Sequence, residues 1–104
     1  MISTKDIRER IEFDFGDKTS EAINIIEEAI AETEYLSQDR IIRCIIFLAN
    51  KDLDKLRNSI QSAIEDPRNV MLWAEYKNLG INENPKRIRD FNKTFAQSEN
   101  NVKE

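Results

Sequence analysis

Along most of the chain, apolar residues recur at the three- and four-residue spacing that is typical of amphipathic helices. The positions that carry this spacing in residues 4–15 and 19–34 are Ile7, Ile11, Phe15, Ile23, Ile26 and Ile30. Ser3 precedes the first stretch, and Thr19 or Ser20 begins the second, so each has a hydroxyl that can cap its first turn. Gly16 suits the left-handed residue that often follows a helix. The pattern therefore predicts two helices, each burying one stripe.

Residues 38–49 carry the most apolar pattern of the sequence. After Arg43, the run from Cys44 to Ala49 contains no polar residue. A helix that is apolar nearly all round belongs in the middle of a structure. The β-branched residues of this run also permit a buried strand. A helix is favoured because the run follows Ser37 as a cap, contains no glycine and has no second strand pattern to pair with.

A further amphipathic stretch at residues 52–65 follows after a link of a few residues. Asp52 can cap this helix. Its apolar positions are Leu53, Leu56, Ile60, Ala63 and Ile64. Because short links join antiparallel neighbours, we expect the helices at 38–49 and 52–65 to form a helical hairpin.

Two more helices are predicted from the pairs Asp66-Pro67 and Asn84-Pro85, since proline suits the first helical position. The first helix should run from 67 to 79, and the second to about 97. The sequence thus predicts an all-α fold, a compact single-domain bundle of five to six helices with a central apolar helix at about 38–49. We expect residues 1–97 to form this helical domain and residues 98–104 to be a polar, disordered tail.

The composition agrees with one helical domain. The chain has 104 residues, of which 39% are hydrophobic and 35% charged, with both signs mixed. Two glycines and two prolines leave little material for hairpin turns, which disfavours a many-stranded sheet. The N-terminus has charges throughout and resembles no secretory signal, and no run approaches the roughly 18 apolar residues of a membrane span. We therefore expect a soluble cytoplasmic protein without a membrane partner.

The net charge of −4 disfavours a general nucleic-acid binder. Positive charge nevertheless gathers near the C-terminus, at Lys86, Arg87, Arg89 and Lys93. A solvated helix face is one interpretation, and a small surface for an anionic partner is the other. A helix-turn-helix around Gly80 fits poorly, because Tyr76 and Lys86 occupy positions that should be small and apolar, respectively.

The chain offers little for catalysis or metal binding. It contains no histidine and one cysteine, Cys44, so zinc sites and triad hydrolases are excluded and no cofactor is expected. Cys44 lies inside an apolar helix, where a thiol usually behaves as a core residue. Glu9 and Glu12 have the Glu-x-x-Glu spacing of helices that hold Mg²⁺ together with a second helix carrying Glu-x-x-Asp. No Glu-x-x-Asp motif follows in this chain, so we interpret these glutamates as part of an acidic, solvent-exposed face. We expect the protein not to be an enzyme.

Trp73, Glu75 and Tyr76 form a cluster on a helix that is apolar on more than one side. Either this helix is sandwiched between others, or one apolar side is a docking surface. Burial is favoured for Trp73 and Tyr76, although both residue types are common at binding hot spots. Glu75 would be costly to bury unpaired. We predict that it meets an arginine, and the candidates are Arg40, Arg43 and Arg68.

The segment from Asp39 to Tyr76 resembles small uncharacterised bacterial helical proteins that carry an Asp-x-Arg-Asp-Val segment and an Ala-Glu-Tyr end. The matching residues here are Asp66, Arg68, Val70, Ala74, Glu75 and Tyr76. Asn69 replaces the second aspartate. The resemblance covers about 38 residues and implies a bacterial helical domain with no known activity, so it transfers no functional residue.

These observations favour a non-enzymatic protein-interaction or regulatory module. Its partner is a protein or a second copy of the chain, as in a homodimer. The candidate contact residues are Trp73, Tyr76, Lys86, Arg87, Arg89 and Lys93. The alternative is a nucleic-acid-binding regulator that uses the basic C-terminal helix.

Overall fold

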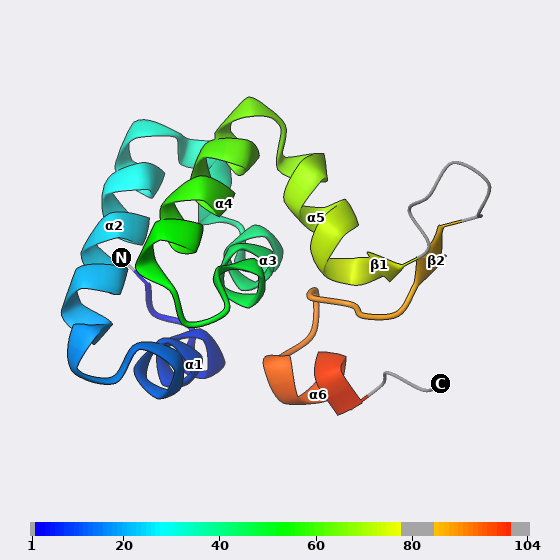
Figure 1. Ribbon diagram of the computed structural model, residues 1–104, viewed down its shortest axis with the longest axis horizontal. Coiled ribbons are helices and arrows are strands. Elements are labelled where there is room, and N and C mark those ends of the chain that lie inside the picture. The colour runs from blue at the N-terminus through cyan, green and yellow to red at the C-terminus, as the bar shows by residue number, and fades with distance from the viewer. Residues whose placement is uncertain (1, 78–84, 101–104) are drawn as a thin grey trace.

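The computed structural model describes residues 2–77 and 85–100, with side chains up to Ser98. The chain folds into an all-α bundle (Figure 1). Its elements are α1 (Lys5–Phe15), the 3₁₀ turn η1 (Gly16–Lys18), α2 (Thr19–Glu32), the 3₁₀ turn η2 (Glu34–Ser37), α3 (Asp39–Ala49), α4 (Leu53–Glu65), α5 (Pro67–Glu75), β1 (Tyr76–Lys77), β2 (Lys86–Arg87) and α6 (Phe95–Asn100).

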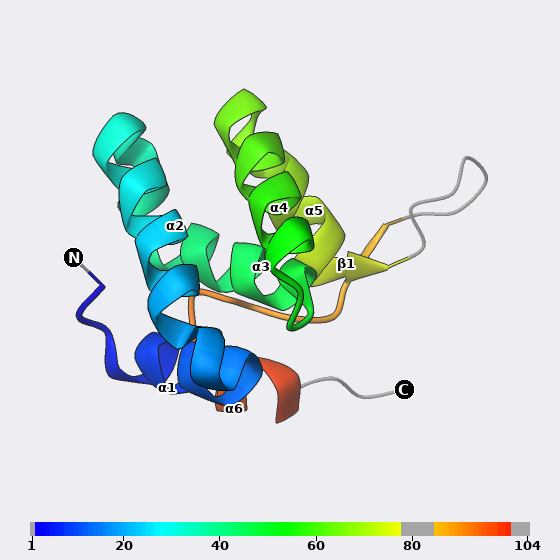
Figure 2. The same cartoon turned by 60° about the vertical axis from the view of Figure 1, so that its left-hand side comes forward.

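Helix α3 lies at the centre of the bundle, as its apolar pattern predicts. It packs against α4 and α5 on one side and against α1 and the C-terminal segment on the other (Figure 2). Cys44, Ile45 and Ile46 are each at most 2% exposed. The alternative of a buried strand at 38–49 is therefore wrong, and the helix prediction is confirmed.

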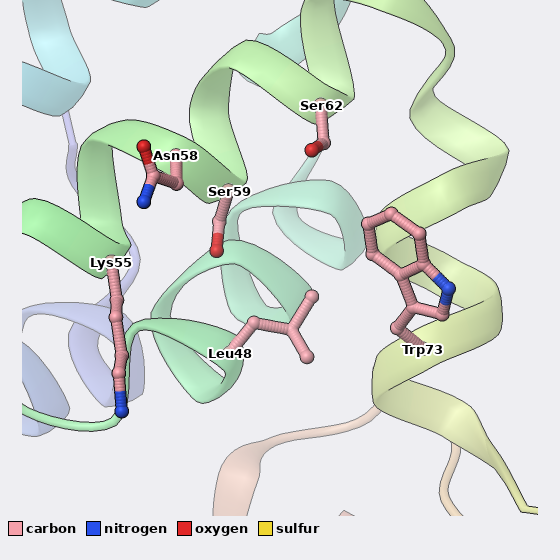
Figure 3. A pocket seen from close by; sticks show the side chains of 6 residues that line it. All are labelled: Leu48, Lys55, Asn58, Ser59, Ser62 and Trp73. Atoms are coloured by element: carbon pink, nitrogen blue, oxygen red, sulfur yellow. The ribbon is translucent and has the colours of Figure 1, made fainter.

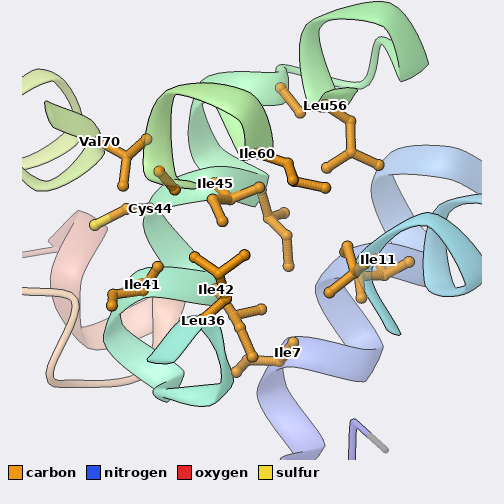
Figure 4. Packing of buried hydrophobic residues seen from close by; sticks show 14 of the residues in the cluster. Ile7, Ile11, Leu36, Ile41, Ile42, Cys44, Ile45, Leu56, Ile60 and Val70 are labelled. Carbon is orange, nitrogen blue, oxygen red and sulfur yellow. The ribbon is translucent and has the colours of Figure 1, made fainter. Parts of the chain in front are cut away.

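The core fills the space between these helices. Isoleucines dominate it: Ile7 of α1 lies near Leu36 and Ile42, and Ile45 of α3 lies near Ile60 of α4 (Figure 4). Burying a side chain of this size contributes about 1.5–3 kcal/mol, so the isoleucine stripes supply much of the driving force for folding. The spacing of apolar residues in the sequence identified these stripes.

The helix starts follow local chemistry at α4 and α5 but not at α1 and α3. The Asp52 carboxylate accepts the N–H groups of Asp54 and Lys55 at 2.8 and 3.1 Å, and Asp66 accepts that of Arg68 at 3.0 Å. The N-cap positions of α1 and α3 are Thr4 and Gln38, and neither makes a side-chain cap bond. The expected caps Ser3 and Ser37 are therefore wrong.

The link between α3 and α4 makes the expected helical hairpin. Asn50 and Lys51 both have positive φ, 48° and 70°. This left-handed pair reverses the chain in two residues, and the N–H of Asp52 closes the turn on the carbonyl of Ala49 at 3.0 Å. Positive φ is uncommon for residues other than glycine, so surrounding contacts hold this turn.

The C-terminal part departs from the prediction. Helix α5 ends at Glu75, and β1 pairs antiparallel with β2 through Tyr76 opposite Arg87 and Lys77 opposite Lys86. The helix expected from Pro85 to 97 does not form over its first ten residues; after β2 the chain is irregular and makes a turn at Phe91 and Asn92 before α6. Residues 78–84, where the fifth helix was expected to end, lie outside the described residues.

The physical reason is that the backbone in this stretch is bonded elsewhere. The N–H of Phe91 donates to the Glu75 carboxylate at 2.9 Å, and its carbonyl accepts from Arg43 at 3.0 Å. Because the single N–H donor of Phe91 is bonded to Glu75, it is not available to the carbonyl four residues earlier, and a regular helix cannot run through this position. Helix α6 then continues to Asn100 and buries Ser98, so the tail expected from residue 98 begins inside a helix.

Candidate functional site

A groove between α4 and α5 is the best candidate for a binding site. Its lining residues come from three helices and are Leu48, Lys55, Asn58, Ser59, Ser62 and Trp73 (Figure 3). Its volume is about 320 Å³, at the lower end of the range for small-molecule sites. Figure 3 shows the Trp73 ring on the α5 wall, the polar side chains on the α4 wall and Leu48 of α3 between them.

The two sides of α5 explain how Trp73 reaches this groove. Val70 and Ala74 are fully buried against the core. Leu72 and Trp73, on the outer side, are 40% and 50% exposed. The burial predicted for Trp73 is therefore wrong: α5 is covered on one side and presents an indole on the other.

The groove combines apolar side chains with mostly neutral polar groups. Lys55 is the one charged residue among its lining residues, and Ser59, Ser62 and Asn58 offer hydroxyl and amide groups. A lysine with neutral neighbours provides neither a general base nor a metal ligand set. The groove can accept an apolar side chain beside the indole and a hydrogen-bonding group on the α4 wall.

Tyr76 does not contribute to this groove. It is half-buried in β1, where its backbone pairs with Arg87. The predicted surface of Trp73 and Tyr76 therefore separates into two parts, and Trp73 alone lines the groove.

The second functional candidate of the sequence, Glu75, is fully buried at the end of α5. Arg40 of α3 binds it at two points, with Nε 3.0 Å from Oε2 and Nη2 2.6 Å from Oε1. Arg87 adds a contact of 3.3 Å to Oε1. The hydrogen bond to Glu75 raises the pKa of Arg40. The carboxylate is thus satisfied on both oxygens by α3, β2 and the Phe91 backbone.

The other two arginines proposed for Glu75 have different partners. Arg43 binds Asp6 of α1 through two bonds of 3.0 and 2.8 Å. Burial opposes ionisation of Asp6, but hydrogen bonds from Arg43 and from the Phe95 N–H prevail and lower its pKa. Arg68 pairs with Asp66 on the surface at 2.8 Å. Arg40 is the partner of Glu75 among the three candidates, and Arg87 was missed.

The basic residues near the C-terminus do not share a helix face. Arg87 is bonded to Glu75 and Asp90, the latter at 2.9 Å. Arg89 lies over the Phe47 ring, 4.4 Å from its centroid, and donates to the carbonyl of Ala74. Lys86 and Lys93 are exposed. Two of the four basic residues predicted to contact an anionic partner are therefore engaged within the fold.

Cys44 and the acidic side chains form neither a reactive thiol site nor a metal site in the described part of the chain. Cys44 is buried, and burial raises the pKa of its thiol, which makes it less reactive. Within residues 2–77 and 85–98, no three acidic, cysteine or histidine side chains gather as metal ligands would. The glutamates on α1 and α2, including Glu9 and Glu12, do not converge.

Sequence reasoning missed the α4 wall of the groove. Lys55, Ser59 and Ser62 recur at helical spacing with Asn58 beside them, so they share one side of α4. The signal available in the sequence was a set of small, neutral polar residues on one side of this helix. They lie between the acidic residues at the start of the helix and its apolar stripe. Its meaning depended on α5 lying opposite, which local periodicity does not show.

Comparison with known proteins adds no family assignment. A scan against protein-family models finds no matching model, and searches of curated proteins and of solved structures find no match either. None of the described helices combines the length and the apolar content that crossing a membrane requires.

Proposed function

We propose that this protein is a non-enzymatic interaction module that binds a partner protein through the groove between α4 and α5. The observation that carries the proposal is Trp73, which is 50% exposed on the wall of an apolar groove. Leaving an indole in contact with water forgoes the stabilisation of burial. Tryptophan is also among the residues that most often dominate the binding energy of interfaces.

The groove defines the kind of partner segment that it accepts. A large apolar side chain fits between Leu48 and the indole, and Ser59 and Ser62 can hydrogen-bond a polar group beside it. Lys55 at the end of the groove favours an acidic residue in the partner, because the lining residues include no carboxylate. We therefore expect a segment that combines one apolar anchor with a nearby acidic residue.

Trp73 also provides the test, because it is the one tryptophan of the chain. Tagged wild-type protein is used to capture partners from the native cell, and each captured protein is then purified and titrated against the module. Binding should shift the Trp73 fluorescence, and Trp73→Ala should weaken the affinity at least about tenfold. Phe13→Ala is the matched control, since Phe13 is an aromatic residue 77% exposed on α1, away from the groove.

Two outcomes would overturn the proposal. One is a partner whose affinity is unchanged by Trp73→Ala but reduced by Phe13→Ala, which would place the interface on α1. The other is a set of captured proteins none of which binds the purified module. Sedimentation of wild type and Trp73→Ala at several concentrations identifies a second copy of the chain as the partner if only the wild type dimerises.

A further inference from the structure

The C-terminal segment from Pro85 to Ser98, here called the strap, runs past α3 from β2 to α6 and crosses below α3 in the view of Figure 2. It joins the end of α5 to α1: β2 pairs with β1, and the N–H of Phe95 donates to Asp6 of α1 at 3.1 Å. Between these ends, Phe91 packs on Phe47 of α3 with ring centroids 5.4 Å apart. The strap therefore covers one side of the central helix.

Two carboxylates, the buried Glu75 and the half-buried Asp6, hold the strap by its backbone. Glu75 accepts the Phe91 N–H at 2.9 Å while Arg40 neutralises it, and Asp6 accepts the Phe95 N–H while Arg43 neutralises it. Both arginines come from α3, and Arg43 also donates to the carbonyl of Phe91. Each of these two sets of bonds, here called a latch, joins a carboxylate of the helical body, an arginine of α3 and a backbone group of the strap.

The helical body depends little on the strap for its apolar core. Of the twenty buried apolar residues in the described chain, eighteen lie between Ile2 and Ala74, and the strap supplies Phe91 and Phe95. Its strand pairing with β1 covers two residues, and α6 is six residues long, too short to be stable alone. Segments with few buried apolar contacts open at lower free energy than the core does.

We propose that the strap is an intrachain lid that opens and closes on α3 as a unit, without unfolding of the helical body, with Glu75 and Asp6 as its latches. The closed strap covers the face of α3 that carries Arg40, Arg43 and Phe47. Opening presents these residues, with Glu75 and Asp6, as a second charged and aromatic surface.

Cys44 provides a probe within the wild-type protein. It is the one cysteine, it is fully buried, and the charges of Glu75, Arg40 and Arg87 all act on its thiol, which therefore lies close to the Glu75 latch and to Arg87 of the strap. A maleimide reacts with this thiol when the strap is open. The labelling rate is measured from zero to moderate urea, together with hydrogen exchange at the amides of Phe91 and Phe95.

The proposal expects a labelling rate that depends weakly on urea at low concentration, because a local opening exposes little surface. The exchange of Phe91 and Phe95 should have the same weak dependence, whereas Ile45 and Ile60 should exchange only through global unfolding. If Cys44 and both phenylalanine amides instead show the full urea slope of global unfolding, the strap does not open by itself and the proposal fails.

Variants then test the latches. Glu75→Gln should speed Cys44 labelling at least about tenfold in the absence of urea, because a neutral amide oxygen accepts the Phe91 N–H and the Arg87 guanidinium of the strap more weakly than the carboxylate does. Ile26→Val on α2 is the control: it weakens the helical body and touches neither latch, so native-state labelling should not change. Equal acceleration in both variants would overturn the proposal. If Glu75→Gln does not fold, the urea dependence of the wild type decides.

Discussion

Arg40 and Glu75 lie 35 positions apart in the sequence and form a two-point ion pair of 2.6 and 3.0 Å. The carboxylate is fully buried, while the Arg40 side chain is 30% exposed. A fully buried carboxylate needs such a partner, since an uncompensated charge in the interior is strongly destabilising. The pair fixes the end of α5 against α3, and it does so beside the point where the strap crosses.

The geometry of this pair predicts that lysine cannot replace Arg40. Arg40→Lys retains the charge but not the planar group that binds both carboxylate oxygens. We expect a loss of about 1.5–3 kcal/mol in the free energy of unfolding, the range for a hydrogen bond to a charged group. Urea denaturation measures it. Arg57→Lys, on an exposed pair with Asp54, should change the stability by less than about 0.5 kcal/mol.

The lowered pKa of Asp6 predicts that the free energy of unfolding falls in acid. Its pKa is lowered in the folded protein, because the hydrogen bonds from Arg43 and the Phe95 N–H outweigh the effect of burial. The stabilisation is therefore complete above the unfolded pKa of about 3.9 and is lost as the pH falls through the lower folded value. Asp6→Asn should flatten the dependence of the unfolding free energy on pH below about 4.5. A pH dependence that Asp6→Asn leaves as steep as in the wild type would contradict this assignment.

The N-cap residues in the structure agree with the sequence prediction at α4 and differ from it at α1 and α3. Asp52→Ala should lower the unfolding free energy by about 1 kcal/mol, because it removes the acceptor for two N–H groups at the start of α4. Ser3→Ala and Ser37→Ala should each have an effect within about 0.5 kcal/mol, because neither residue is the N-cap of a helix. Thermal unfolding of the three variants, followed by circular dichroism, checks this ranking. A loss at Ser3 or Ser37 equal to that at Asp52 would contradict it.

Phe91 and Trp73 should contribute very differently to stability, because Phe91 is buried and Trp73 is half exposed. Phe91 is fully buried between Phe47 and Phe95, so Phe91→Ala should cost about 3–5 kcal/mol in unfolding free energy. Trp73→Ala should change the unfolding free energy by much less, about 0–1 kcal/mol, because half of the side chain already faces water. Urea denaturation followed by circular dichroism measures both, since fluorescence is lost with Trp73. A large loss at Trp73 would assign the indole a structural role.

The helical body was predictable from the sequence, whereas the C-terminal segment was not. In α2 and α4 the apolar stripes match the buried sides, and Asp52 and Asp66 cap the helices they precede. Ile88, Phe91 and Phe95 have a spacing that also suits a helix, and Asn84-Pro85 suits its start. The helix does not form there, because Glu75 and Arg43, which are distant in the sequence, bind the backbone of Phe91 directly.

The candidate site was predictable in part. An arginine partner for Glu75 follows from the cost of burying a lone charge, and the choice of Arg40 over Arg43 or Arg68 depended on where α5 ends relative to α3. Trp73 was recognised as important, but its exposure depended on α4 and α5 diverging enough to leave a groove between them (Figure 3).

The sequence by itself determined the helices of the body, two of their caps, the central place of α3 and the need for a charge partner at Glu75. These follow from contacts within a few residues and from the spacing of apolar side chains. Only the tertiary structure decided the course of the strap, the second latch at Asp6 and the exposure of Trp73. These features depend on bonds between residues 16 to 89 positions apart, which leave no periodic signal along the chain.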